Sequence, residues 1–116
     1  MYDRPKGKAH ALNAGIQKAK GDIYAFTDDD CIVQPNWLET IHAAFNKHKT
    51  AVAIFGKTLP YNPLYHKNRI CPSLFLNKKQ AIITKPVTHY NTIGFGNNMA
   101  IRASALSQYG GFKEWL

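Results

Sequence analysis

Three consecutive carboxylates, Asp28-Asp29-Asp30, directly follow the apolar run Ile23-Tyr24-Ala25-Phe26. The run has the length and composition of a buried strand, so the charges fall at its C-terminal end. Open parallel sheets bind their ligands outside this end of the strands. Adjacent negative charges repel one another, and a bound cation would remove the repulsion. Because the ligand atoms are oxygens, the sequence predicts a site for a hard ion, Mg²⁺ or Mn²⁺.

The two cysteines, Cys31 and Cys71, have the spacing of neither a metal-ligand pair nor a disulfide framework. Reduced thiols in a cytoplasmic setting are therefore expected. Cys31 stands beside the aspartates and is either a further metal ligand or a buried, inert thiol. We favour the buried thiol.

The length of 116 residues, 45% of them hydrophobic, allows one globular domain at most. A run of about 18 apolar residues, which a membrane-spanning helix needs, is missing, and the polar first residues predict no signal peptide. The net charge of +8 favours anionic partners such as nucleotide phosphates, acidic lipid head groups or nucleic acid. A well-solvated basic surface is the alternative explanation of this charge.

Helical and strand patterns alternate around the aspartates. Residues 8–20 have helical spacing with Gly21 as the expected C-cap, and residues 22–27 form the strand, covered on both faces. A second helix follows Pro35, and its apolar stripe consists of Trp37, Leu38, Ile41, Ala44, Phe45 and His48. Residues 51–55 form a second strand. Strand, helix and strand at this spacing predict a right-handed crossover between two parallel neighbours.

The second half of the chain is less regular. Residues 57–91 are interrupted by prolines and are expected to form a long irregular segment that covers substrate, with one short helix near 72–80. Order then returns in three short pieces: a strand or loop at 91–96, an extended piece at 98–101 and a helix at 103–109 that Gly110-Gly111 ends. The predicted fold class is α/β, with a mainly parallel sheet flanked by helices.

Four stretches of sequence occur in a specific order: GKAHALNAG at 7–15, GDIYAFTDDD at 21–30, PNWL at 35–38, and GNNMAIR at 96–102 followed by YGGF at 109–112. Together they resemble the family 2 glycosyltransferases. The resemblance extends over most of the chain and implies a partial GT-A (Rossmann-like) fold for a single domain, residues 1–116. It also implies transfer of a sugar from a nucleotide-diphospho-sugar donor to an acceptor hydroxyl, with inversion.

In that family a D-x-D motif holds the divalent cation and the donor. Asp28 and Asp30 match its positions, and Asp29 is an alternative because some members use adjacent aspartates. A cation on the phosphates would stabilise the charge that the departing nucleoside diphosphate gains. The resemblance also places Lys8 near the diphosphate and lets Asn13 either bind the donor or fix the loop that does. Both residues equally suit an exposed helical face.

Further residues are expected on the acceptor or sugar side, namely Phe95, Gly96, Asn97 and Asn98. Glycines allow close approach of the backbone to a ligand, and amides match sugar hydroxyls. A tight turn stabilised by asparagine is the alternative interpretation. His10 is expected to be solvated.

The family pattern is only partly present. Its opening, nucleoside-binding strands would precede this chain, and its general base is expected beyond Leu116, because Glu114 does not match the acidic motif. We therefore expect no catalytic residue within residues 1–116, an inactive isolated chain, and self-association through an exposed sheet edge. The parent enzyme would use a carbohydrate or lipid-linked acceptor, in the cytoplasm or at the cytoplasmic face of a membrane.

Three other classes of protein are alternatives to this one. A non-catalytic module that binds a nucleotide or carbohydrate through a metal would keep the aspartates and need no base. A nucleic-acid-binding domain is disfavoured, because the aspartates would repel phosphate and none of its motifs is present. A dinucleotide-binding oxidoreductase would need G-x-G-x-x-G between a strand and a helix, and Gly94-Phe95-Gly96 lacks the third glycine.

Overall fold

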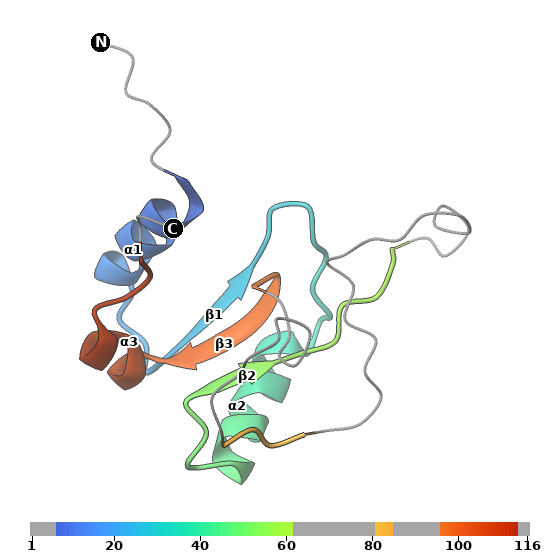
Figure 1. The fold of residues 1–116 in the computed structure, drawn as a ribbon. Coiled ribbons are helices and arrows are strands. Elements are labelled where there is room, and N and C mark those ends of the chain that lie inside the picture. The colour runs from blue at the N-terminus through green and yellow to red at the C-terminus, as the bar shows by residue number, and fades with distance from the viewer. Residues whose placement is uncertain (1–6, 62–80, 85–95, 114–116) are drawn as a thin grey trace. The chain divides into compact units, whose positions relative to one another are not determined.

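The computed structural model describes residues 7–61, 81–84 and 96–113 (Figure 1). Its elements are α1 (Gly7–Lys18), β1 (Ile23–Thr27), α2 (Trp37–Lys47), β2 (Ala53–Phe55), β3 (Asn98–Arg102) and α3 (Ala103–Tyr109). This confirms the α/β class. The helix predicted near 72–80 and most of the strand or loop predicted at 91–96 lie outside the described residues. In the described parts of the chain, each helix is too short or too polar to cross a membrane.

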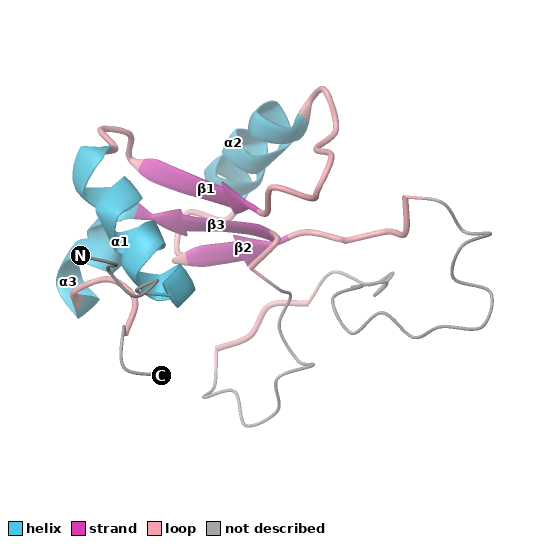
Figure 2. Ribbon diagram, turned by 90° about the horizontal axis from the view of Figure 1, so that it is seen from above, coloured by secondary structure: helices cyan, strands magenta, loops and turns pink. Residues whose placement is uncertain are grey.

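The strands form a sheet in the order β1-β3-β2. Figure 2 shows that β3 runs opposite to both β1 and β2. The prediction that the first two strands are neighbours is wrong, because β3 lies between them and bonds to both. A mainly parallel sheet is likewise not found among the described residues, where the neighbouring strands are antiparallel. Strand pairing depends on a segment that arrives much later in the chain.

The chain divides into two compact units, and one of them consists of Ala25–Ala100. Here α2 packs against β2 and buries Phe45, which is 2% exposed. The predicted amphipathic pattern forms this helix, although it begins at Trp37 rather than at Pro35. Leu38, expected in the apolar stripe, is 65% exposed because it lies on the solvent side of the first turn.

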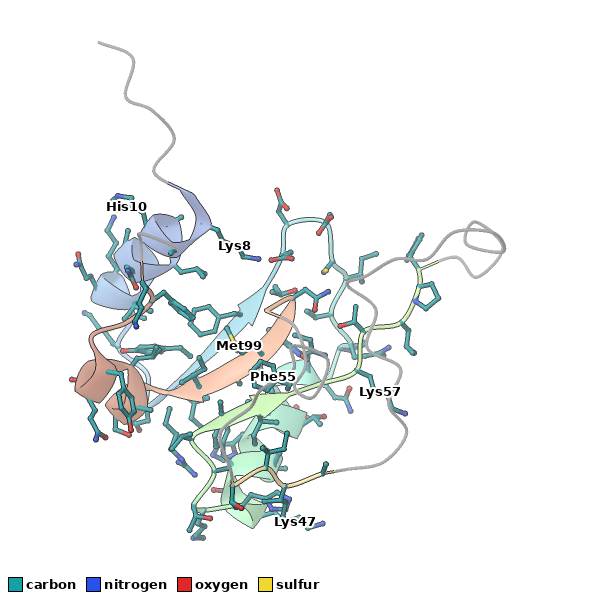
Figure 3. All side chains as sticks on the ribbon, viewed as in Figure 1. Lys8, His10, Lys47, Phe55, Lys57 and Met99 are labelled. Carbon is teal, nitrogen blue, oxygen red and sulfur yellow. The ribbon has the colours of Figure 1, made fainter. Side chains whose placement is uncertain are left out.

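Strands β2 and β3 meet in the same unit. The Gly56 N–H donates to the Asn98 carbonyl oxygen at 3.0 Å, next to Phe55 and Met99 on the two strands (Figure 3). Met99 and Ala100 are buried. Strand β2 is shorter than the predicted 51–55. This pairing places the start of β3 beside the end of β2.

The other unit consists of Met1–Tyr24 and Ile101–Leu116. Helix α1 ends at Lys18, before the predicted residue 20, and the Ala19 N–H still donates to the Gly15 carbonyl oxygen at 3.0 Å. Gly21 is therefore not the C-cap, and it is not among the glycines with positive φ. The helix ends without a left-handed residue.

Helix α3 has the predicted bounds. Gly110 and Gly111 end it with φ angles of 78° and 84°. The Gly111 N–H donates to the Leu106 carbonyl oxygen at 3.0 Å, which is a typical way to close a helix with glycine. Leu106 is buried.

Strand β1 begins at Ile23, one residue later than predicted, and is less buried than its apolar sequence suggested. Residues 23–26 are half-buried and Thr27 is exposed. The expected cover on both faces is thus not found among the described residues. In the strand order, β1 lies at one end.

Candidate functional site

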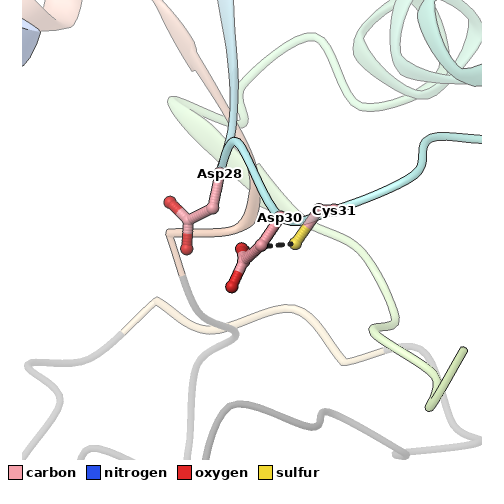
Figure 4. Close-up of side chains that lie close together, drawn as sticks. All are labelled: Asp28, Asp30 and Cys31. Atoms are coloured by element: carbon pink, nitrogen blue, oxygen red, sulfur yellow. Dashed lines mark hydrogen bonds between the residues drawn. The ribbon is translucent and has the colours of Figure 1, made fainter.

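The three aspartates lie in a tight turn that directly follows β1. The Cys31 N–H donates to the Asp28 carbonyl oxygen at 3.2 Å, which closes a four-residue turn. The turn brings ligand atoms of Asp28, Asp30 and Cys31 within 4.8 Å of one another (Figure 4). Asp29 is exposed and does not belong to this group. Asp28 and Asp30, which have the spacing of a D-x-D motif, thus lie close together, and Cys31 lies beside them.

The Cys31 thiol is a hydrogen-bond donor in this group. Its Sγ atom donates to Asp30 Oδ1 at 3.7 Å. Partial burial raises the pKa of the thiol, and the negative charges of Asp30 and Asp28 raise it further, while a backbone hydrogen bond at Asp28 acts in the opposite direction. The thiol is therefore protonated at neutral pH. The prediction of a buried Cys31 is wrong, because the residue is half-buried.

The chemistry of these donors fits a hard divalent cation. Asp28 is half-buried and Asp30 is exposed, so their oxygens remain within reach of an ion from solution. Mg²⁺ binds through one or two carboxylates and fills its other positions with water and substrate phosphates. A neutral thiol is a poor ligand for such an ion. The two aspartates are therefore the candidate ligands, and Cys31 is the group beside them that sequence reasoning set aside.

The side-chain amides of Asn97 and Asn98, predicted on the sugar side, form hydrogen bonds with other residues of the chain. Asn98 Oδ1 accepts a hydrogen bond from Trp37 Nε1 at 2.9 Å, and its Nδ2 donates to the Lys57 carbonyl oxygen at 2.7 Å. Asn97 is buried, and its Oδ1 accepts from Thr58 Oγ1 at 3.1 Å.

The neighbouring Gly96 is half-buried, and Phe95 lies outside the described residues. The prediction that these four residues lie near the sugar or the acceptor stays a prediction.

Gly56 makes room for the Asn98 side chain. A Cβ atom built on Gly56 would contact the Asn98 amide, at 2.8 Å from its Cγ. The same amide borders a cavity of about 240 Å³ in the unit Ala25–Ala100. Other residues of its lining include Gln34, Trp37, Ile41, Ile54 and Lys57. Sequence reasoning did not single out Trp37, Gly56 or Lys57 for this role, because they are distant from Asn98 in sequence.

The residues predicted on α1 lie in the other unit. Asn13 Oδ1 accepts from the Phe112 N–H at 2.8 Å, and Asn13 Nδ2 donates to the Phe112 carbonyl oxygen at 2.8 Å. These bonds hold the backbone at Phe112, and the expectation that Asn13 binds the donor or fixes the loop that does stays a prediction. Lys8 is exposed in the first turn of α1, and His10 is half-buried in the same helix (Figure 3). A donor contact of Lys8 stays a prediction.

Comparison with known proteins identifies related sequences. The sequence pattern of the family described as glycosyl transferase family 2 matches residues 2–110. A curated relative, the glucosyl-dolichyl phosphate glucuronosyltransferase of Haloferax volcanii, is 31% identical over 58 residues. The aligned segment is 50% of this chain and 18% of that relative, so only a small part of the relative's length is matched. No solved structure matches the chain significantly.

Proposed function

This chain belongs to glycosyl transferase family 2, and we propose that the whole protein transfers a sugar from a nucleotide-diphospho-sugar donor to an acceptor hydroxyl. The acceptor is a carbohydrate or a lipid-linked molecule. The name of the Haloferax volcanii relative, which contains a dolichyl phosphate, supports the lipid-linked class. The single observation that carries the proposal is the pair Asp28 and Asp30 on one side of the turn after β1.

Each carboxylate has a role in this proposal. One of Asp28 and Asp30 would ligate a divalent cation, and the other would hold that ion through a water or accept a hydrogen bond from the donor's ribose. The bound cation supplies charge neutralisation for the leaving nucleoside diphosphate. The Cys31 thiol donates to Asp30 and thereby holds that carboxylate in one orientation.

The proposal is tested by binding of Mn²⁺ to the chain. Free Mn²⁺ is counted by electron paramagnetic resonance while the ion is titrated into the protein with uridine diphosphate present. Asp28→Asn and Asp30→Asn should each weaken Mn²⁺ binding by about tenfold or more, because each removes the charge of a candidate ligand. Asp29→Asn is the matched control, since it removes the same charge from the same turn at an exposed position.

Three outcomes of this titration are distinct. Unchanged binding in Asp29→Asn together with losses in the other two variants supports the D-x-D assignment. Equal losses in all three variants would mean that only the net charge of the turn attracts the ion. Absence of Mn²⁺ binding in the unmodified chain would overturn the metal assignment.

A further inference from the structure

Most residues of the loop that carries the carboxylates are exposed. It runs from the end of β1 to Trp37, the first residue of α2. Its backbone hydrogen bonds include one that closes the acidic turn, one from the Trp37 N–H to the Gln34 carbonyl oxygen at 3.0 Å, and one from the Thr40 N–H to the Asn36 carbonyl oxygen at 2.9 Å, where α2 begins. Ile32 and Val33, between the first two of these bonds, are 79% and 41% exposed. With little burial along the loop, its conformation depends on how firmly its ends are held.

The far end is held by the Trp37 side chain. Its indole N–H donates to Asn98 Oδ1 at 2.9 Å, and the indole itself is part-buried. The same amide donates to the Lys57 carbonyl oxygen, and the Asn98 backbone accepts from Gly56. A single residue thus ties the start of α2 to the end of β2 and the start of β3. All of these residues belong to the same compact unit as the acidic turn.

An asparagine side chain is well suited to this position. The indole N–H can only donate and the carbonyl can only accept, so the group between them must do both. Aspartate at position 98 would accept from the indole but place its charge against the Lys57 carbonyl. Alanine would leave both partners without their bond. The absence of a Cβ at Gly56 gives the amide its space.

We propose that Asn98 is a positioning residue of the metal site, which acts through Trp37 to fix the loop of Asp28 and Asp30. This inference rests on the proposed function. Asn98, which the sequence predicted to lie near the sugar or the acceptor, would then act indirectly in metal binding. Without the anchor the loop samples conformations that do not bind the ion, and the apparent affinity falls in proportion to the binding-competent fraction.

The experiment measures Mn²⁺ affinity and indole fluorescence on the full chain. Trp115→Phe is the background, because it leaves Trp37 as the only indole. In that background Asn98→Ala and Trp37→Phe should each weaken Mn²⁺ binding by about tenfold, the order typical for residues that orient metal ligands. Asn46→Ala, at an exposed asparagine of α2, is the matched control and should bind like the background.

Two further measurements separate positioning from general damage. The double variant should lose no more affinity than either single variant, because both remove the same bond. Asn98→Ala should also shift the Trp37 emission in the absence of metal, since the indole loses its acceptor. Circular dichroism confirms that the variants fold, and if Asn98→Ala does not fold, the milder Trp37→Phe decides.

Full Mn²⁺ affinity in a folded Trp37→Phe or Asn98→Ala variant would overturn the inference and leave the metal site intact. Additive losses in the double variant would also overturn it, since two independent effects would then be at work. If the background chain itself binds no Mn²⁺ while its Asp28→Asn variant behaves identically, the proposed function fails, and this inference fails with it.

Discussion

Replacing Gly111 by alanine should destabilise the chain more than the same change at Gly110. Both glycines have a left-handed backbone, with φ angles of 84° and 78°. They differ in their surroundings. A Cβ atom on Gly111 would lie 2.6 Å from Asn13 Oδ1, whereas one on Gly110 would meet no atom of the described residues within 4 Å. The pair therefore separates backbone strain from a specific contact.

The expected magnitudes follow from these two effects. A left-handed backbone costs a residue with a Cβ about 1–2 kcal/mol, and both variants bear this cost. Gly111→Ala also displaces the Asn13 amide from its two hydrogen bonds to Phe112, each of which stabilises the fold by about 1 kcal/mol. Gly110→Ala should thus lower the free energy of unfolding by about 1.5 kcal/mol, and Gly111→Ala by about 3.5 kcal/mol.

Urea unfolding followed by circular dichroism measures both values, provided that the slope with denaturant stays the same. The decisive control is the Asn13→Ala background. Once the amide is absent, the Cβ at position 111 has space, and the two glycine variants should lose similar amounts. Equal losses in the unmodified chain would refute the reasoning. So would an excess loss at Gly111 that persists without Asn13.

Three further outcomes follow from burial and charge. Phe45→Ala should lower the free energy of unfolding by about 3–5 kcal/mol, because Phe45 is buried. Leu38→Ala should change it by less than about 0.5 kcal/mol, because Leu38 is 65% exposed. Similar urea midpoints for the two variants would contradict this packing. In a Cys71→Ser background, Asp30→Asn should speed alkylation of Cys31 by iodoacetamide, because loss of the negative charge lowers the pKa of the thiol; an unchanged rate would show that Asp30 does not act on it. Folding raises the pKa of the Cys31 thiol, so its contribution to the free energy of unfolding should be fully present below the pKa of the unfolded thiol and should be lost as pH rises through the pKa of the folded one. Melting temperatures measured across alkaline pH should therefore fall less steeply for Cys31→Ser than for the unmodified chain.

Local patterns predicted the elements better than their arrangement. The bounds of α3 followed from the sequence because two glycines end it, and α2 followed from its apolar spacing. The strand order did not follow. Hydrophobic patterning of β1 and β2 is the same whether they are neighbours or separated by β3, and the choice depends on a segment distant in sequence. For the same reason the sequence did not predict that β1 lies at one end of the strand order and is only half-buried.

The proximity of Asp28 and Asp30 could be predicted because both lie in one short turn. Their role as metal ligands stays a prediction. The partners of Asn98 could not be predicted, since the Trp37 indole and the Lys57 carbonyl meet it only in the folded chain. Cys31 had a visible signal, its position next to Asp30, but its hydrogen bond depends on the turn's geometry.

Two asparagines in this chain solve the same physical problem. Asn13 presents its amide to the Phe112 backbone beside Gly111, and Asn98 joins the Trp37 indole to a backbone carbonyl beside Gly56.

In each case the side-chain amide acts like a peptide group, as donor and acceptor together, and a glycine provides the space it occupies. The sequence left Asn13 open between binding the donor and fixing the loop that does, and it predicted Asn98 on the acceptor or sugar side because amides suit sugar hydroxyls. The hydrogen bonds of both side chains to protein groups favour structural roles instead.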